Sequence, residues 1–171
     1  AQPFVQMDLT RIVREVISDL EIKVEETGAK IEISDLPAID ADPLQMRQLF
    51  QNLIGNALKF RRSEIVPHIK IYPLETVSDI HKTLTVGSFA EFAVEDNGIG
   101  FEEKYLDRIF TVFQRLHGRA EYEGSGVGLA VCRKIVERHG GKITARSKPN
   151  EGAIFIISLP VKQLRGGFLD E

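Results

Sequence analysis

The feature that most restricts the fold of this chain is the order in which the spacing of its apolar residues changes. Apolar side chains recur at the helical spacing of about 3.6 residues over residues 9–27, and they alternate with polar ones over residues 30–37. Asp42 and Pro43 are typical of a helix start, which predicts a second helix from there to about Arg62.

Four strand patterns and two helical patterns follow. The strands are expected at 68–75, 82–96, 141–147 and 153–160, and the helices at 102–113 and 127–139. Helices interleaved with mostly antiparallel strands predict an α+β fold. We expect a two-layer sandwich whose mixed, mostly antiparallel sheet is covered on one face by about three helices.

Length and composition exclude several classes of protein. The chain has 171 residues, 43% of them hydrophobic and 27% charged, which fits one domain over 1–171 and excludes disorder and a disulfide scaffold. A net charge of -3 gives no overall reason to expect nucleic acid or an anionic membrane as partner. The single Cys132 cannot build an internal disulfide or a thiolate metal cluster. These features permit a reducing compartment without proving one, and we expect a cytoplasmic domain without nucleic-acid or membrane contacts.

The stretch EFAVEDNGIGF, residues 91–101, allows two interpretations. Asn97 and Gly98 after alternating apolar residues are typical of a tight hairpin, but the next segment has a helical pattern instead of a return strand. Asp96 shares a face with the apolar residues of this strand, so its carboxylate needs a partner, such as the exocyclic amino group of adenine. Gly98 and Gly100 carry no Cβ and would let a flat ring approach the backbone.

A polar stripe on the second helix adjoins the core. Asn52, Asn56 and Lys59 lie on one side of the segment QLFQNLIGNALKF, next to its apolar face. A solvated helix face is the plain alternative. Asparagine is, however, a mediocre residue for a helix interior, amide oxygens can ligate Mg²⁺, and an ammonium can contact phosphate.

Alternating glycines open the helix expected at 127–139. Gly124, Gly126 and Gly128 precede or begin it, and a helix start offers free N–H groups and a positive dipole end to phosphate. A tight junction between a loop and a helix would use the same residues. The sequence has no GxxxxGK[ST] pattern, which excludes a P-loop.

These three motifs, in this order, resemble the catalytic ATP-binding domain of sensor histidine kinases, in the superfamily that includes gyrase, heat-shock chaperones and mismatch-repair ATPases. NLIGNALKF resembles the N box, DNGIGF the first glycine box, IFTVFQRLHG the phenylalanine box and GSGVGLAV the second glycine box. The resemblance covers nearly the whole chain. The segment TVFQRLHGRAEYEGS looks like a flexible lid over the nucleotide.

The resemblance implies a set of site residues. Asn56, with Asn52 nearby, corresponds to the Mg²⁺ ligand, Lys59 to a phosphate contact, and Asp96 to the adenine anchor. Asn52, Asn56 and Lys59 would be catalytic. Arg115 would reach phosphate from the lid, although a solvated loop arginine explains it equally well. The remaining nucleotide contacts implied are Phe60, Gly98, Ile99, Gly100, Gly124, Gly126, Val127, Gly128 and Leu129.

The activity implied is that of a protein-histidine kinase fragment that binds Mg-ATP or Mg-ADP. Its γ-phosphoryl group would go to a histidine on a dimerisation domain expected before residue 1, and from there to a response regulator. None of the four histidines, His68, His81, His117 and His139, has the acceptor context, and we expect surface or capping roles. A conformational ATPase of the chaperone or topoisomerase type, or a pseudo-kinase, is the alternative. Hydrolysing relatives carry a glutamate where Asn52 stands.

Overall fold

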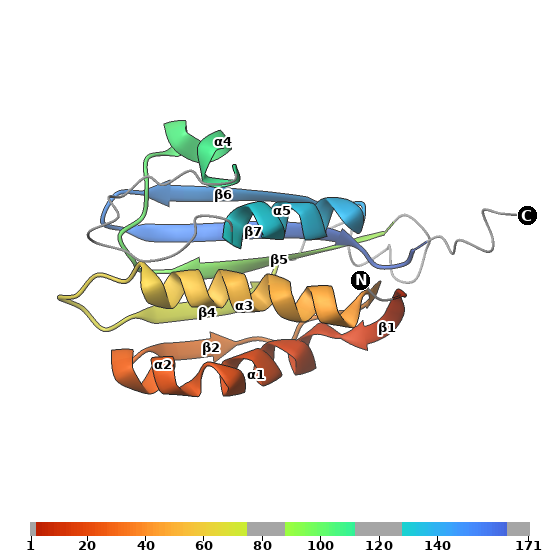
Figure 1. Ribbon diagram of the computed structural model, residues 1–171, viewed down its shortest axis with the longest axis horizontal. Helices are drawn as coiled ribbons and strands as arrows, with labels where there is room; N and C mark the ends of the chain where they lie inside the picture. Colours follow the sequence, from red (N-terminus) through yellow and green to blue (C-terminus); the bar gives the residue numbers. More distant parts are fainter. Residues whose placement is uncertain (1–2, 75–87, 112–127, 164–171) are drawn as a thin grey trace, which may run out of the picture.

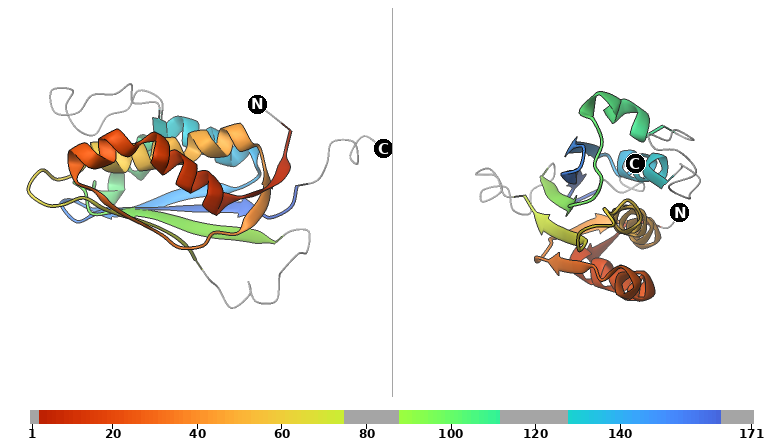
Figure 2. Two further views of the ribbon diagram at one scale, coloured as in Figure 1. Left: turned by 90° about the horizontal axis from the view of Figure 1, so that it is seen from below. Right: turned by 90° about the vertical axis from the view of Figure 1, so that its left-hand side faces the viewer.

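The computed structural model describes residues 3–74, 88–111 and 128–163, and helices cover one face of its main sheet (Figures 1 and 2). This is the expected α+β sandwich. The elements are, in chain order, β1 (Val5–Asp8), α1 (Leu9–Asp19), α2 (Glu21–Thr27), β2 (Lys30–Ile33), β3 (Ala38–Ala41), α3 (Pro43–Lys59), β4 (His68–Pro73), β5 (Phe89–Asp96), the 3₁₀ turn η2 (Glu103–Tyr105), α4 (Leu106–Ile109), α5 (Gly128–Arg138), β6 (Lys142–Lys148) and β7 (Gly152–Pro160).

The main sheet has five strands in the order β2-β4-β5-β7-β6. β2 and β4 pair in parallel, whereas the other neighbours pair antiparallel, so the sheet is mixed and mostly antiparallel as predicted. β1 and β3 form a separate antiparallel pair that the sequence analysis did not predict. Each of these strands has only four residues, which is too short for a clear alternation.

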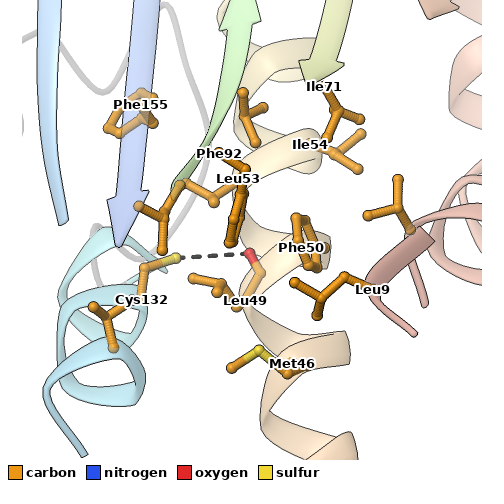
Figure 3. Packing of buried hydrophobic residues seen from close by; sticks show 14 of the residues in the cluster. Leu9, Met46, Leu49, Phe50, Leu53, Ile54, Ile71, Phe92, Cys132 and Phe155 are labelled. Atoms are coloured by element: carbon orange, nitrogen blue, oxygen red, sulfur yellow. Dashed lines mark hydrogen bonds between the residues drawn. The ribbon is translucent and has the colours of Figure 1, made fainter. Parts of the chain in front are cut away.

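The core lies between the sheet and α1, α3 and α5. Phe50 of α3 and Phe92 of β5 are fully buried and lie 5.5 Å apart between ring centroids (Figure 3). On the α5 side, the Cys132 thiol donates to Leu49 O at 3.8 Å, and burial raises the pKa of Cys132 to about 12. Cys132 therefore belongs to the packing between α3 and α5 and is protonated at neutral pH.

The helix starts follow the sequence signals, and one helix is interrupted. The Asp42 carboxylate accepts from Gln45 N–H at 3.1 Å and caps α3, which ends at Lys59, three residues before the expected end. The single helix expected over 9–27 is wrong, because Leu20 (φ -99°, ψ 11°) separates α1 from α2. The Leu20 N–H is shared between two carbonyls of the preceding turn, which tightens that turn.

The helix expected over 102–113 is also shorter than predicted. A 3₁₀ turn, η2, replaces its first turn, and α4 is four residues long. The predicted segment from residue 112 onward lies outside the described residues, as does the start of the strand expected over 82–96. Within the ranges 3–74, 88–111 and 128–163, no helix combines the length and the hydropathy needed to cross a membrane.

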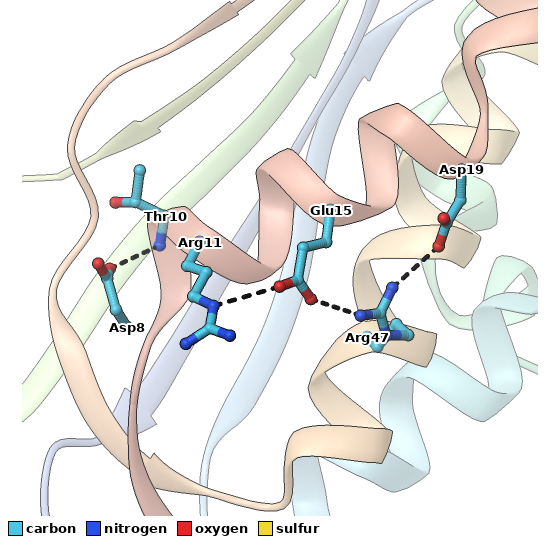
Figure 4. A network of polar contacts seen from close by, with 6 residues as sticks. All are labelled: Asp8, Thr10, Arg11, Glu15, Asp19 and Arg47. Atoms are coloured by element: carbon cyan, nitrogen blue, oxygen red, sulfur yellow. Dashed lines mark hydrogen bonds and ion pairs between the residues drawn. The ribbon is translucent and has the colours of Figure 1, made fainter.

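Charged side chains join α1 to α3 on the outer surface of the helix layer (Figure 4). Arg47 of α3 pairs with Asp19 at 2.9 Å and also with Glu15, which in turn pairs with Arg11 at 3.2 Å. All of these side chains are at least one third exposed, so each pair contributes little to stability.

Candidate functional site

Two of the predicted site segments meet where α3 passes the start of α5. The Asn52 side-chain N–H donates to Gly128 O at 3.3 Å. An added Cβ on Gly128 would stand 3.9 Å from Asn52 Cγ and 3.9 Å from Asn56 Nδ2, so both amides lie against the first residue of α5. The polar stripe of α3 therefore faces a neighbouring helix start and is not a freely solvated face.

The end of α3 is bonded to the loop that follows β5. Phe60 is the C-cap of α3, and its carbonyl accepts from Ile99 N–H at 2.9 Å. A Cβ on Gly98 would stand 2.5 Å from that carbonyl oxygen, so the approach requires glycine. The Lys59 ammonium lies 5.1 Å from the centroid of the Phe60 ring. Lys59 and Gly98 are thus held within the same corner of the fold.

Asp96 is the last residue of β5 and lies on the helix-covered face, as the period of two predicts. Its carboxylate accepts from Gly98 N–H at 2.9 Å. Burial, with a smaller contribution from the charge of Glu95, raises the pKa of Asp96 to about 6, against the backbone N–H groups of Gly98 and Ala153, which lower it. Above that pH the carboxylate is ionised and can accept a hydrogen bond from an amino group.

Asn97 anchors this loop, a role that the sequence analysis missed. Its side-chain oxygen accepts from His68 N–H at 2.8 Å, and its side-chain N–H donates to Val66 O at 3.0 Å. Its own carbonyl accepts from Arg62 Nε at 3.0 Å. The dipeptide Asn97-Gly98 therefore connects this loop to the start of β4 and does not form a hairpin, in agreement with the helical pattern that argued against one.

Other predicted residues have different outcomes. Leu129 is partly buried and packs against the hydrophobic core, which leaves its predicted nucleotide contact as a prediction. Gly100 adopts φ +64° in the same loop as Gly98 and Ile99. The residues that lie outside the described ranges are Arg115, Gly124, Gly126, Val127 and the lid segment from residue 112 onward.

His139 is not a surface histidine. Its side chain is 1% exposed, its Nδ1 lies 2.7 Å from Ile135 O, and its Nε2 accepts from Asp42 N–H at 3.1 Å. Because Nε2 accepts, Nδ1 must carry the proton and donate to the carbonyl, which satisfies the end of α5. His68 lies at the start of β4, 3.9 Å from Glu32, with its side chain 43% exposed. His81 and His117 lie outside the described residues.

The donors at this corner suit a metal ion only in combination with a ligand. In the part of the chain that the structure describes, no group of three His, Cys, Asp or Glu side chains could hold a metal ion. Asn52 and Asn56 offer amide oxygens, which are hard ligands of the kind that Mg²⁺ accepts. Mg²⁺ typically keeps several waters and binds through few protein groups plus substrate phosphates, so this donor set fits a metal that arrives with phosphates.

The α/β sandwich thus places one buried carboxylate, Asp96, and the two helix-borne amides of Asn52 and Asn56 at the same end of the fold. A sequence profile described as histidine kinase-, DNA gyrase B-, and HSP90-like ATPase matches residues 41–163. The chain belongs to this family and is a nucleotide-binding domain.

Named relatives match most of this chain but only part of their own length. Phytochrome-like protein Cph1 of Synechocystis sp. is 44% identical over 154 residues, which is 90% of this chain and 19% of the relative. Adaptive-response sensory kinase SasA of Prochlorococcus marinus (strain MIT 9303) is 38% identical over 164 residues, which is 94% of this chain and 41% of the relative. The chain thus covers less than half of either protein.

Solved structures share the fold. The catalytic domain of histidine kinase ThkA superposes with a TM-score of 0.74 at 26% identity, covering 95% of this chain and all of that chain. Full-length ShkA in complex with AMPPNP gives a TM-score of 0.74 at 25% identity, covering 95% of this chain and 32% of that chain. Both matches extend over nearly all of the sandwich.

Proposed function

We propose that this chain is the catalytic domain of a sensor histidine kinase, which binds Mg-ATP and donates the γ-phosphoryl group to a histidine on a separate domain. The observation that carries the proposal is the role of α3 as a shared support. Its asparagines lie against the start of α5, and the carbonyl of its C-cap residue, Phe60, holds the loop that follows Asp96. One helix therefore aligns the groups suited to phosphate and metal with the group suited to adenine.

Each residue has a proposed part in binding. The Asp96 carboxylate accepts a hydrogen bond from the adenine amino group, and the glycines of the loop let the ring approach the backbone. Asn56, supported by Asn52, holds Mg²⁺ through its amide oxygen, and Lys59 contacts phosphate. When bound, Mg²⁺ neutralises charge on the phosphates during transfer. ShkA, which shares this fold, was solved with AMPPNP, and this supports the proposal that the present domain binds a nucleotide.

The acceptor is proposed to lie on another domain. Both ring nitrogens of His139 are engaged inside the fold, and His68 lies in a strand beside Glu32. His139 is therefore not placed to receive a phosphoryl group. A histidine supplied by a docking partner would instead attack the γ-phosphorus in line, with ATP held in position by this domain.

The same arrangement argues against a conformational ATPase. Rapid hydrolysis needs a general base to take the proton of water, and loss of a positioned base typically lowers the rate by about a hundred- to ten-thousandfold. Asn52 is a neutral amide and donates to Gly128 O, so it cannot act as that base. We therefore expect slow phosphate release by the isolated chain.

The test combines binding with phosphoryl transfer. Calorimetry should show Mg-dependent ATP binding that Asn56→Ala weakens by at least about a hundredfold, because the metal loses a ligand. Gln48→Ala, which removes an exposed amide one turn before Asn52, is the matched control and should bind normally. γ-labelled ATP should label a fragment that carries the parent's acceptor histidine. Brisk phosphate release without labelling would favour the ATPase.

A further inference from the structure

The turn between β6 and β7 packs tightly against the loop that follows Asp96. A Cβ on Gly100 would stand 2.2 Å from Lys148 O, and a Cβ on Gly152 would stand 2.0 Å from Asp96 O. Asn150 N–H, in the same turn, donates to Ile99 O at 2.6 Å. At Gly100 and Gly152 the backbone of one segment thus lies directly against the backbone of the other. The turn therefore limits where the loop can lie.

The Ser147 hydroxyl connects these two segments. It accepts from Phe101 N–H at 2.8 Å and donates to Gly152 O at 2.6 Å. The Ser147 backbone N–H in turn donates to the Glu103 carboxylate at 3.0 Å. Ser147 is 7% exposed, so water cannot readily replace these bonds. One buried hydroxyl therefore joins the end of the loop to the end of the turn.

The two segments that Ser147 connects also carry the backbone donors of Asp96. Gly98 N–H, from the loop, donates to the Asp96 carboxylate at 2.9 Å. Ala153 follows Gly152 and supplies the second backbone hydrogen bond. If the loop and the turn move apart, the carboxylate loses the alignment that both donors give it. Ser147 can thus influence Asp96 without touching it.

We propose that Ser147 is a positioning residue for the nucleotide base, because its hydroxyl holds loop 97–101 against the β6–β7 turn and thereby orients the Asp96 carboxylate. This inference rests on the proposed function of the site. Ser147 acts through the loop, so it governs nucleotide affinity and not the rate of phosphoryl transfer once ATP is bound.

The first measurement is nucleotide affinity. Ser147→Ala should weaken Mg-AMPPNP binding by about tenfold, which is the effect of losing one buried hydrogen bond. Ser147→Thr keeps the hydroxyl and should restore most of the affinity. Ser158→Ala is the matched control, since Ser158 pairs with Glu91 and Lys142 on the same sheet, away from the site. Labelling of the acceptor fragment at saturating ATP should be unchanged in all three variants.

The second measurement needs no nucleotide. Carbon-detected NMR titration of the Asp96 carboxyl should give a higher pKa in Ser147→Ala than in the unaltered chain, because two donors that favour the ionised form lose alignment. Glu95, the charged neighbour that acts on Asp96, is unchanged in these variants. Ser158→Ala should leave the titration unchanged. A role in stability alone would lower the melting temperature without moving this pKa.

The outcomes separate the inference from the function on which it rests. A raised Asp96 pKa together with weaker binding supports both. A raised pKa in a chain that binds no ATP supports positioning and overturns the proposed function. Unchanged pKa and unchanged affinity in Ser147→Ala overturn the positioning role, whatever happens to stability. If Ser147→Ala does not fold, the same two measurements on Glu103→Gln, which weakens the bond to the Ser147 N–H, decide in its place.

Discussion

The two ends of the antiparallel helix pair α3 and α5 are held by different kinds of contact, mostly side chains at one end and close backbone packing at the other. At one end, which we call the clasp, Arg138 pairs with the buried Asp42 at 2.8 Å, and His139 accepts from Asp42 N–H. The Phe4 ring stacks on His139 with centroids 4.4 Å apart, and Gln163 donates to His139 O at 2.6 Å. The clasp therefore binds the segment before β1 and the segment after β7 to the helix pair.

At the other end, which we call the site corner, the Asn52 side chain donates to Gly128 O. Asp96 there packs closely against Gly98 and Gly152. Among the described residues every buried side-chain polar atom has a hydrogen-bond partner, so neither end is left unsatisfied. Their titrating groups nevertheless differ, because burial lowers the pKa of His139 and raises that of Asp96. The clasp, with His139 neutral, thus stabilises the fold at neutral pH. The site corner, with Asp96 ionised, lowers the stability of the fold at that pH, but the ionised carboxylate can accept a hydrogen bond from a ligand.

The largest expected effect tests whether the backbone of the site corner is rigid. Gly152→Ala places a Cβ 2.0 Å from Asp96 O at φ +100°, which should cost at least about 3 kcal/mol of unfolding free energy. Gly55→Ala is the control, because a Cβ there meets nothing within 4 Å inside a helix and should be neutral or slightly stabilising. Urea titration measures both. Equal stability of the two variants would show that the backbone of the site corner can shift to accommodate the added Cβ, which would contradict the prediction.

The next effect belongs to the clasp alone. His139→Ala removes the acceptor of Asp42 N–H and the ring that stacks on Phe4, and should cost about 2 to 4 kcal/mol. ATP affinity of the folded variant should be unchanged, because the site corner lies at the far end of the helices. His68→Ala, at a half-exposed position, should change stability little. A large loss of affinity in His139→Ala would mean that the two ends are coupled.

The pH dependence of binding should separate the ends further. Burial raises the pKa of Asp96 to about 6, so below that pH its carboxylate becomes protonated and would lose the proposed hydrogen bond from adenine. We expect ATP affinity to fall about tenfold for each pH unit below 6. Asp96→Asn should bind weakly at every pH. Calorimetry between about pH 5 and 8 checks this, and a flat profile in the unaltered chain would contradict it.

The contributions of the clasp and of the site corner to the stability of the fold should change in opposite directions with pH. His139 has a lowered pKa in the fold, so the unfolded chain binds more protons below the ordinary value of about 6.5. Stability from His139 is therefore present above that pH and is lost as the pH falls through it. Asp96, with a pKa raised from 3.8 to about 6, gives stability at low pH that is lost as the pH rises between these two values. Thermal melts of Asp96→Asn isolate the clasp contribution.

The smallest effect concerns the surface pairs, which belong to neither end. Arg47→Ala removes the pairs with Glu15 and Asp19 and should cost less than about 1 kcal/mol, since all three side chains are partly exposed. ATP affinity should not change. High salt should reduce the difference from the unaltered chain. A loss of unfolding free energy as large as that of His139→Ala would mean that the contacts between α1 and α3 stabilise the fold as strongly as the clasp does.

Periodicity predicted the layers of this fold better than its interruptions. The period of two placed Asp96 on the covered face, and the helical period placed Asn52 and Asn56 on one stripe. A proline within a strand is typical of an edge strand or a bulge, yet β4, which ends at Pro73, is internal, with β2 on one side and β5 on the other. The residue is tolerated because β2 pairs only as far as Ile71, so beyond that point no ladder donor is needed on the side of β4 that faces β2.

The support of the site was beyond the reach of local patterns. Ser147 and Phe101 are 46 residues apart in sequence, and Ser147 and Glu103 are 44 apart. Their hydrogen bonds depend on the pairing of β5 with β7, which no local spacing specifies. Gly152 and the positive φ of Asn150 mark a turn, but a turn signal does not say which segment the turn will contact.

The pairing of β5 with β7 also has a consequence for the order of folding. β6 and β7 are neighbours in sequence and can form a hairpin early, on the timescale of about 1–10 μs for local hairpins. The pairing of Asp96 with Ala153 closes a much longer loop, so it comes late. Gly152, and with it the contact between the β6–β7 turn and loop 97–101, reaches its place only at that step. During refolding, the ability to bind nucleotide should therefore appear last, only after β5 has paired with β7 and the sheet is complete.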